Sequence, residues 1–256
     1  MINIHEVREV HLELTTNCNA SCPLCPRNFF GYPYNAGYPD SELSLENIQT
    51  IFQPKFIAQL SVIRLNGNLG DFMLARDNLQ IVEYFRTHNP TARIDISTNG
   101  SARNQDFWQS LAQYNPVVRF ALDGLEDTHH LYRQDTSFDT IIRNAGYFMA
   151  AGGKAVWRFT EFEHNKHQIE QARDLAYRLG FDEFVTRPNN RSHRPVYDRG
   201  GNKVFSIGNV TYPFPNKIDQ TYITTKFKNL PIHKVTKSPP KCESTDLKSL
   251  YIGATG

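Results

Sequence analysis

Short apolar runs alternate with longer amphipathic segments over roughly the first three quarters of the chain. Each run is rich in β-branched or aromatic residues and is short enough to form a buried strand. In the first run, Val10, Leu12 and Leu14 recur at every second position, so they share one face of a strand. The pattern predicts six strands, at residues 7–14, 60–66, 92–97, 117–122, 154–160 and 182–187.

Helix-sized segments lie between these strands and carry recognisable end signals. Ser44 is a predicted N-cap, while Gly152-Gly153 and Gly180 follow two segments as C-cap signals. Helices are predicted at residues 45–60, 75–88, 104–114, 138–151 and 165–179. Alternating strands and helices predict an α/β fold with a parallel sheet and right-handed crossovers. Six strands are too few for a closed eight-stranded barrel, so we expect a partial (β/α)6 TIM-like barrel with its chemistry at the carboxyl ends of the strands.

Composition changes near Pro188. Residues 1–187 have a formal charge of −5, whereas residues 188–256 have a charge of +7 and hold 7 of the 14 prolines. The regular apolar pattern ends at the same point, and loops with short antiparallel strands are expected beyond it. We therefore predict two parts, a barrel over residues 1–187 and a basic, proline-rich extension over residues 188–256.

Bulk properties exclude several classes of protein. The formal net charge of +2 does not indicate a nucleic acid or a membrane surface as partner. No stretch approaches the roughly 20 apolar residues of a membrane span. The N-terminal segment MINIHEVREV lacks the apolar core of a secretion signal. We expect a cytoplasmic protein, in which four cysteines favour metal or redox chemistry over a disulfide framework.

Three of the four cysteines lie in the eight-residue segment CNASCPLC, at Cys18, Cys22 and Cys25. A redox pair formed by Cys22 and Cys25 leaves Cys18 without a role. A structural zinc site needs a fourth ligand, such as Cys242 or a distant histidine. A [4Fe–4S] cluster held by three thiolates accounts for all three residues and leaves one iron open to a ligand.

The spacing Cys18-x3-Cys22-x2-Cys25 after a first strand resembles the signature of the radical S-adenosylmethionine (SAM) superfamily. The resemblance implies that the amino and carboxylate groups of SAM bind the open iron. It also implies that an electron from the cluster, supplied by a reductant such as flavodoxin or ferredoxin, cleaves SAM to a 5′-deoxyadenosyl radical. That radical abstracts hydrogen from a substrate. In this resemblance Leu24, before the third cysteine, packs near the adenine of SAM.

The ends of the next three strands resemble further landmarks of this family. The segment NGNLGD (66–71) stands where the family has a Gly-Gly-Glu-like segment, and STNG (97–100) resembles a family segment with the same letters. LDG (122–124), with the histidine, tyrosine and arginine that follow it, resembles a third pattern. Plain turns explain the glycines as well, and a surface role remains open for Arg133. The resemblance implies SAM-binding roles for Asn66, Gly67, Asn68, Asp71, Ser97, Thr98, Asn99, Asp123 and Arg133, the last pairing with the SAM carboxylate.

The end of the chain resembles the opening of a SPASM or twitch module, which binds auxiliary iron–sulfur clusters. The resemblance rests on Cys242 and the final seven residues, LYIGATG. The sequence stops where further cysteines are expected, as in a truncated form of a longer enzyme or in a shortened relative that has lost the auxiliary site. We therefore expect no complete auxiliary cluster, and the alternative for Cys242 is an ordinary free cysteine. Residues 251–253 are then expected to form an edge strand that lacks a mate.

The substrate is less defined. The SPASM or twitch resemblance implies a peptide or protein side chain, whereas the basic extension favours an anionic small molecule; nucleic acid is a weaker third option. Polar residues 161–165 follow the fifth strand, where substrate is expected, although Asn165 is equally suited to cap the next helix. The rival hypothesis is a zinc-stabilised binding module or an iron–sulfur electron carrier without SAM chemistry.

Overall fold

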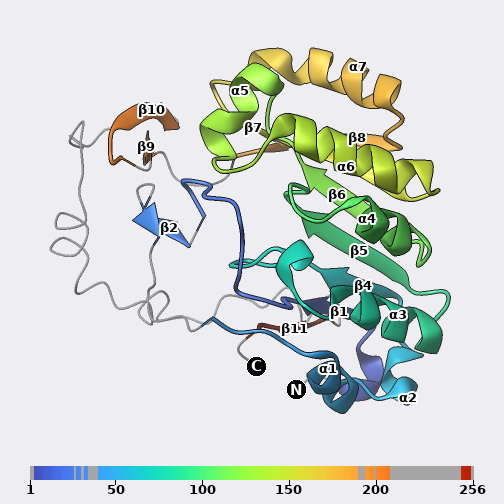
Figure 1. Ribbon diagram of the computed structural model, residues 1–256. Coiled ribbons are helices and arrows are strands. Elements are labelled where there is room, and N and C mark those ends of the chain that lie inside the picture. The colour runs from blue at the N-terminus through green and yellow to red at the C-terminus, as the bar shows by residue number, and fades with distance from the viewer. Residues whose placement is uncertain are drawn as a thin grey trace, which may run out of the picture.

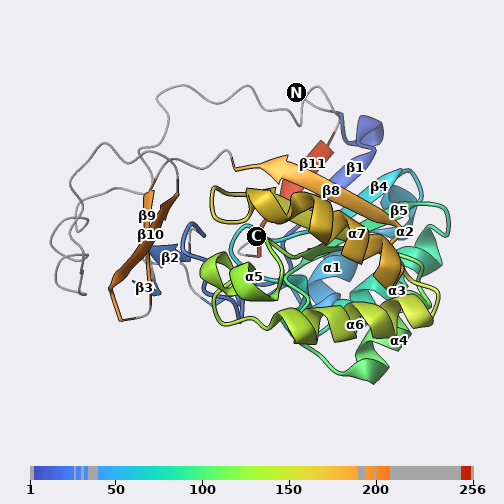
Figure 2. The ribbon, with the colours of Figure 1, turned by 90° about the horizontal axis from the view of Figure 1, so that it is seen from above.

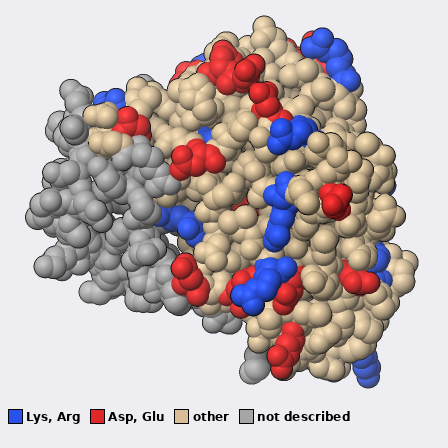
Figure 3. Space-filling view, in the orientation of Figure 1, with Lys and Arg blue, Asp and Glu red and all other residues tan. Residues whose placement is uncertain are grey.

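The computed structural model describes residues 3–25, 27–29, 32–33, 40–189, 194–198, 200–207 and 249–254. Cys242 and most of the basic extension lie outside these residues. None of the helices in the described ranges combines the length and the apolar character that crossing a membrane requires. Acidic and basic side chains are interspersed over the face of the molecule that Figure 3 shows.

A seven-stranded parallel sheet forms the centre of the molecule, in the order β11-β1-β4-β5-β6-β7-β8 (Figure 1). The two end strands, β11 and β8, do not pair with each other, so the barrel is open. The prediction of a partial, parallel β/α barrel is therefore confirmed. The strands are β1 (Glu9–Leu12), β4 (Val62–Leu65), β5 (Arg93–Thr98), β6 (Val117–Ala121), β7 (Lys154–Glu161), β8 (Glu183–Pro188) and β11 (Ser249–Ile252).

Helices follow the strands and cover one face of the sheet (Figures 1 and 2). Ser44 caps the first with a capping box, as predicted, and Gly180 ends the last in the left-handed conformation. The α-helices are α1 (Leu45–Ile51), α2 (Pro54–Ile57), α3 (Asn78–His88), α4 (Gln105–Ala112), α5 (Glu126–Tyr132), α6 (Phe138–Ala150) and α7 (Ile169–Leu179). Short 3-10 helices are η1 (Ile4–Glu6), η2 (Phe72–Leu74) and η3 (Lys166–Gln168).

The helices differ from the prediction in two places. The single helix expected over residues 45–60 is two, because Pro54 starts α2 and restricts the residue before it to extended backbone. Helix α5 was not predicted, since its seven residues, EDTHHLY, show no apolar periodicity. The short helix nevertheless carries Tyr132 and positions the following Arg133.

One strand has a partner that the sequence did not indicate. β11 pairs in parallel with β1, with Tyr251 in register with His11. The expectation of an edge strand without a mate is therefore wrong: residues 249–252 lie at the sheet edge but extend the barrel by one strand. The described residues also form two small antiparallel sheets, β2 (Asn28–Phe29) with β3 (Tyr32–Pro33) and β9 (Arg194–Tyr197) with β10 (Lys203–Ile207).

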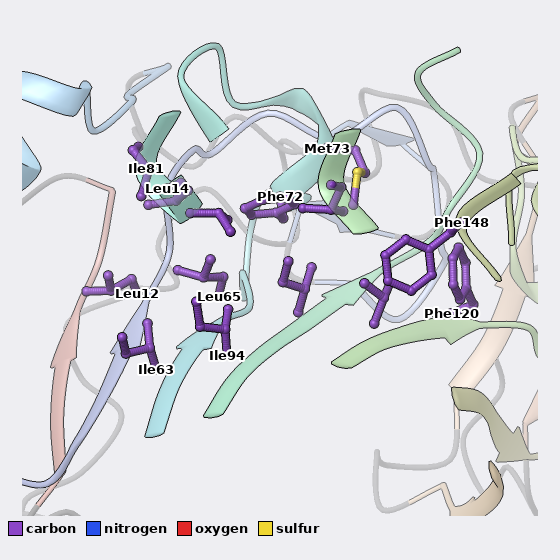
Figure 4. Close-up of a cluster of buried hydrophobic side chains, with 14 of the residues drawn as sticks. Leu12, Leu14, Ile63, Leu65, Phe72, Met73, Ile81, Ile94, Phe120 and Phe148 are labelled. Atoms are coloured by element: carbon purple, nitrogen blue, oxygen red, sulfur yellow. The ribbon is translucent and has the colours of Figure 1, made fainter. Parts of the chain in front are cut away.

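The two faces of the sheet differ in chemistry because side chains alternate along each strand. Ile63, Leu65 and Ile94 are buried under the helices and lie in one apolar layer (Figure 4). At one end of this layer, Phe120 is packed against Trp108 and Phe148 at ring-centroid distances of 5.2 and 6.3 Å. The opposite, inner face carries mostly polar and charged residues, so the apolar core is confined to the helix side.

Replacing the central aromatic residue of this layer should destabilise the fold. Phe120→Ala leaves a cavity between Trp108, Phe148 and Phe181, because none of these fully or almost fully buried rings can collapse into it without strain. We expect the free energy of unfolding, measured by urea denaturation, to fall by about 3–5 kcal/mol. Tyr177→Ala, at a position that is 55% exposed, is the control and should change it by less than about 0.5 kcal/mol. A Phe120→Ala loss as small as the control's would contradict this account of the core.

Candidate active site

The three clustered cysteines follow β1 and line one pocket at the carboxyl ends of the strands. Nitrogen donors lie beside the sulfur atoms of Cys18 and Cys22, whereas Cys25 Sγ lies 4.0 Å from the Asn68 carbonyl oxygen. The backbone N–H of Ala20 lies 3.4 Å from Cys18 Sγ, and Asn99 Nδ2 lies 3.7 Å from the same sulfur. Arg133 Nη1 lies 3.6 Å from Cys22 Sγ. Donors of this kind stabilise the thiolate form, which is the form that binds metal.

Without a bound metal, the thiols of Cys18 and Cys22 are poor acids. Burial raises the pKa of the Cys18 thiol to about 12, and the nearby Asp71 carboxylate adds to the rise. Burial also raises the pKa of Cys22, although Arg133 opposes this effect. The two thiols are therefore protonated at neutral pH, and a metal cluster that binds them must displace their protons.

Asp71 joins the loop after β4 to the end of β5. Its carboxylate is buried and accepts hydrogen bonds from Thr98 Oγ1 at 2.7 Å, from the Asn99 N–H at 2.7 Å and from the Met73 N–H at 3.0 Å. Burial raises the pKa of Asp71, and these three hydrogen bonds oppose the rise. Asn99 continues the network because its Nδ2 donates to Asn19 Oδ1 at 2.9 Å, within the cysteine loop. The strand ends and the cysteines thus form one hydrogen-bonded unit.

Glu13 holds the glycine-containing loop that follows β4. Its Oε1 accepts from the N–H groups of Leu69 and Gly70, and its Oε2 accepts from the Tyr251 hydroxyl at 2.9 Å. The loop passes so close to the cysteine segment that a β-carbon at Gly70 would overlap the Thr15 carbonyl. Sequence reasoning missed Glu13, although a buried acid at the end of a first strand is an unusual residue there.

Arg133 is held by Asp123, which is fully buried. Arg133 Nε donates to Asp123 Oδ2 at 2.6 Å, and the second carboxylate oxygen accepts from the Thr160 N–H at 2.6 Å. Burial lowers the pKa of Arg133, but Asp123 and Cys22 outweigh this and raise it well above the ordinary value. Arg133 is therefore a fixed cation beside the cysteines, and the alternative of a surface arginine is excluded by its 15% side-chain exposure.

Two further side chains support this part of the site. Asn165 is buried and makes no capping hydrogen bond; its Nδ2 donates to the carbonyls of Asp123 and Thr160 at 3.2 and 2.9 Å. His129 Nε2 lies 3.0 Å from the Thr136 hydroxyl, which itself donates to the Arg133 carbonyl at 2.6 Å. Nε2 therefore carries the imidazole proton, and the buried Nδ1 has no partner among the described residues.

Most of the residues predicted to bind cofactor come together in one pocket. Two do not line it: Asp123 lies behind Arg133, and Leu24 packs in a second apolar cluster with Cys22, Tyr132 and Phe162. Leu69, Gly70 and Tyr132 also line it and lie in the strand-end segments that resemble the family. Lining residues outside those segments and the predicted set are Ala20, Ala121, Arg158, Thr160 and Asn189. The predicted residues that do line the pocket are Cys18, Cys22, Cys25, Asn66, Gly67, Asn68, Asp71, Ser97, Thr98, Asn99 and Arg133.

The family of the chain follows from a comparison of its sequence with known families. Residues 12–176, more than half of the chain, match the family described as Radical SAM superfamily. The chain belongs to the radical SAM superfamily. The match covers the cysteine loop and the barrel strands from the end of β1 to β7, which supply every lining residue of the pocket except Asn189.

Three proteins illustrate what this chain is similar to. GTP 3′,8-cyclase of Staphylococcus epidermidis is 24% identical over 152 residues, which are 57% of this chain and 43% of that protein. SuiB of Streptococcus suis, bound to the precursor peptide SuiA, superposes with a TM-score of 0.57 at 16% identity, over 71% of this chain and 39% of SuiB. Native anSMEcpe with bound AdoMet gives a TM-score of 0.57 at 14% identity, over 87% of this chain and 58% of anSMEcpe. The chain spans less than two thirds of each protein's length, and the structural similarity is one of fold.

The radical SAM cofactors are a [4Fe–4S] cluster and SAM, and the residues present fit both. The three thiols line the pocket, and those of Cys18 and Cys22 lie beside N–H donors. The adjacent loop contains Gly70, whose lack of a side chain lets the Thr15 carbonyl approach its backbone. In the described ranges, no three His, Cys, Asp or Glu side chains are arranged to hold one metal ion. This does not conflict with an iron–sulfur cluster, which would need one thiolate for each of several irons and not three ligands around one ion.

The buried His129 should make the stability of the chain depend on pH. Burial and Arg133 lower its pKa from 6.5 to about 4. The unfolded chain takes up a proton below pH 6.5 and the folded chain only near pH 4, so stability falls as pH decreases through this window. The free energy of unfolding, measured by urea denaturation, should therefore fall between about pH 7.5 and about pH 4.5. We expect His129→Gln to make this fall smaller by up to about 3 kcal/mol. The exposed His5→Gln is the control; an equal effect of both variants would disprove the role of His129.

Proposed function

We propose that this chain is a radical SAM enzyme whose cluster is held by Cys18, Cys22 and Cys25. The observation that carries the proposal is that the three thiols line one pocket with the ends of β4, β5 and β6. When bound, the reduced cluster supplies one electron that cleaves SAM to methionine and a 5′-deoxyadenosyl radical, which abstracts hydrogen from the substrate. A reductant such as flavodoxin or ferredoxin is the proposed partner.

The chain's own contribution is to bind and orient SAM. We propose that the SAM amino group binds to the backbone of residues 66–70, which Glu13 holds in place. Asn99 and the β5 end, fixed by Asp71, supply short-range donors and acceptors beside the cysteines. Arg133, locked by Asp123, is the proposed partner of the SAM carboxylate.

The apolar cluster around Cys22 limits the access of water to the cysteine loop. Cys22 is packed with Ala20, Tyr132, Phe162 and Val196, all of which are buried. The last of these residues lies in β9, so a strand after Pro188 contributes to the wall of the site. A dry wall beside the cysteines protects a reactive radical from side reactions.

For the substrate we propose two classes, a peptide or protein side chain and an anionic small molecule. SuiB binds a precursor peptide and anSMEcpe binds a Kp18Cys peptide, which supports a peptide or protein side chain. GTP 3′,8-cyclase is named for a nucleotide substrate, which supports an anionic small molecule. The division of the chain into a barrel over residues 1–187 and an extension over residues 188–256 remains a proposal, in which the extension returns one strand, β11, to the sheet of the barrel.

Anaerobic reconstitution with iron and sulfide tests the proposal. We expect a brown protein whose visible absorbance is bleached by dithionite and which forms 5′-deoxyadenosine from SAM. Cys22→Ala should lose both the colour and the SAM cleavage, because a cluster with two thiolate ligands is not held. The product is quantified by chromatography.

Cys242→Ala is the matched control, since this cysteine lies outside the CNASCPLC segment. This variant should keep the colour and cleave SAM at the wild-type rate. A colourless wild-type protein with one bound zinc ion, or full SAM cleavage by Cys22→Ala, would overturn the proposed function.

A further inference from the structure

The pocket has a second half that the binding of SAM leaves without a role. The residues assigned to the cluster and SAM come from the cysteine loop and from the ends of β4 to β6. The remaining polar lining includes Arg158 and Thr160 of β7 and Asn189 after β8. These residues lie on the neighbouring strands of the same barrel edge, where a substrate must approach the SAM carbon.

The direction of these side chains follows from the alternation along β7. Trp157 and Phe159 are fully buried on the helix side, in contact with Phe184 of β8 at ring-centroid distances of 6.0 and 5.9 Å. Arg158 and Thr160 therefore point to the opposite, inner face. Arg187 of β8 is in register with Thr160, so it lies on the same inner face.

Two acids of the inner face, Glu9 and Asp95, are already paired with other arginines. Asp95 is in ion pairs with Arg64, Arg93 and Arg119, at N–O distances of 3.2, 2.9 and 2.8 Å. In the described part of the chain, no carboxylate lies within ion-pair distance of Arg158 or Arg187. The β7–β8 side of the inner face therefore carries two positive charges without counter-ions among these residues.

Asp123 is the acid that influences Arg158 electrostatically, but it does not neutralise it. Both oxygens of Asp123 are occupied, one by Arg133 and the other by the Thr160 N–H. Burial and the charge of Arg133 lower the pKa of Arg158 to about 10, with Asp123 opposing the shift. Arg158 remains a cation at neutral pH, but its environment disfavours that charge until an anion binds.

SAM brings a single carboxylate, and Arg133 is the cation that contacts the cysteines, at Cys22 Sγ. Arg158 of β7 is a second cation in the same pocket, and a second anion is needed to balance its charge. We propose that Arg158, assisted by Arg187 and the Thr160 hydroxyl, binds an anionic group of the substrate, a carboxylate or a phosphate. This inference rests on the proposed function and extends it by naming the charge of the substrate group.

Binding of model anions to the reconstituted, SAM-loaded chain tests the inference. Pyrophosphate and GTP probe the phosphate source; N-acetylglutamate and a glutamate-containing peptide probe the carboxylate source. We expect at least one pair of probes to bind by isothermal titration calorimetry. Arg158→Gln should weaken that binding about tenfold or more, while the Kd for SAM and the absorbance of the cluster stay within about twofold of wild type.

Three further variants complete the test. Arg158→Lys should recover part of the affinity, because lysine restores the positive charge but lacks the planar guanidinium group that can bind two oxygen atoms at once. Arg187→Gln, at an exposed position, should weaken binding about threefold even if Arg158→Gln does not fold. Arg178→Gln, on the exposed face of α7, should leave every Kd unchanged.

Two results would overturn the inference while the proposed function stands. In the first, the wild-type chain forms 5′-deoxyadenosine but binds none of the four probes. The same conclusion follows if Arg158→Gln or Arg187→Gln binds the probes with the wild-type Kd. In the second, Arg158→Gln weakens SAM binding as much as probe binding, which would make Arg158 the SAM carboxylate partner. Loss of the cluster in the wild-type chain would instead refute the proposed function.

Discussion

Parallel pairing of the strands is the constraint on which the rest of this structure depends. Seven strands run in the same direction, so their carboxyl ends meet along one edge of the open barrel. Residues separated by more than a hundred positions, such as Cys22 and Arg133, become neighbours there. The helices cover only one face of the sheet, and the inner face is left to polar side chains that line the pocket.

Three buried carboxylates convert this edge into a defined site. Asp71, Asp123 and Glu13 each accept hydrogen bonds from backbone or side-chain groups of segments that are distant in the chain. A buried carboxylate is costly unless it is fully hydrogen-bonded, and here its bonds fix the loops that line the pocket. These acids therefore act as positioning groups; Asp71 is the one of the three that lines the pocket, beside thiols, hydroxyls, amides and arginines.

Local patterns were sufficient for much of the fold and for part of the site. The six predicted strands are present because β-branched runs bounded by turn residues have few alternatives in a chain of this composition. The cysteine spacing and the glycine-containing strand ends were visible because each lies within a few residues. Helix α5 and the break before Pro54 show the limits of such patterns. A seven-residue helix is too short for an apolar period to be recognised in it, and one proline divides a continuous apolar pattern into two helices.

The sequence by itself determined the strand order along the chain, the three-thiol loop and the set of polar strand ends. Tertiary structure decided which of these residues meet. It placed Asp123 behind Arg133 and Leu24 in a separate cluster, and it brought Tyr251 to Glu13 by adding β11 beside β1. Within the described ranges, it also left Arg158 without a carboxylate at ion-pair distance. The physical reason is that such contacts depend on strand register and on side-chain direction, which are set by packing across the whole sheet.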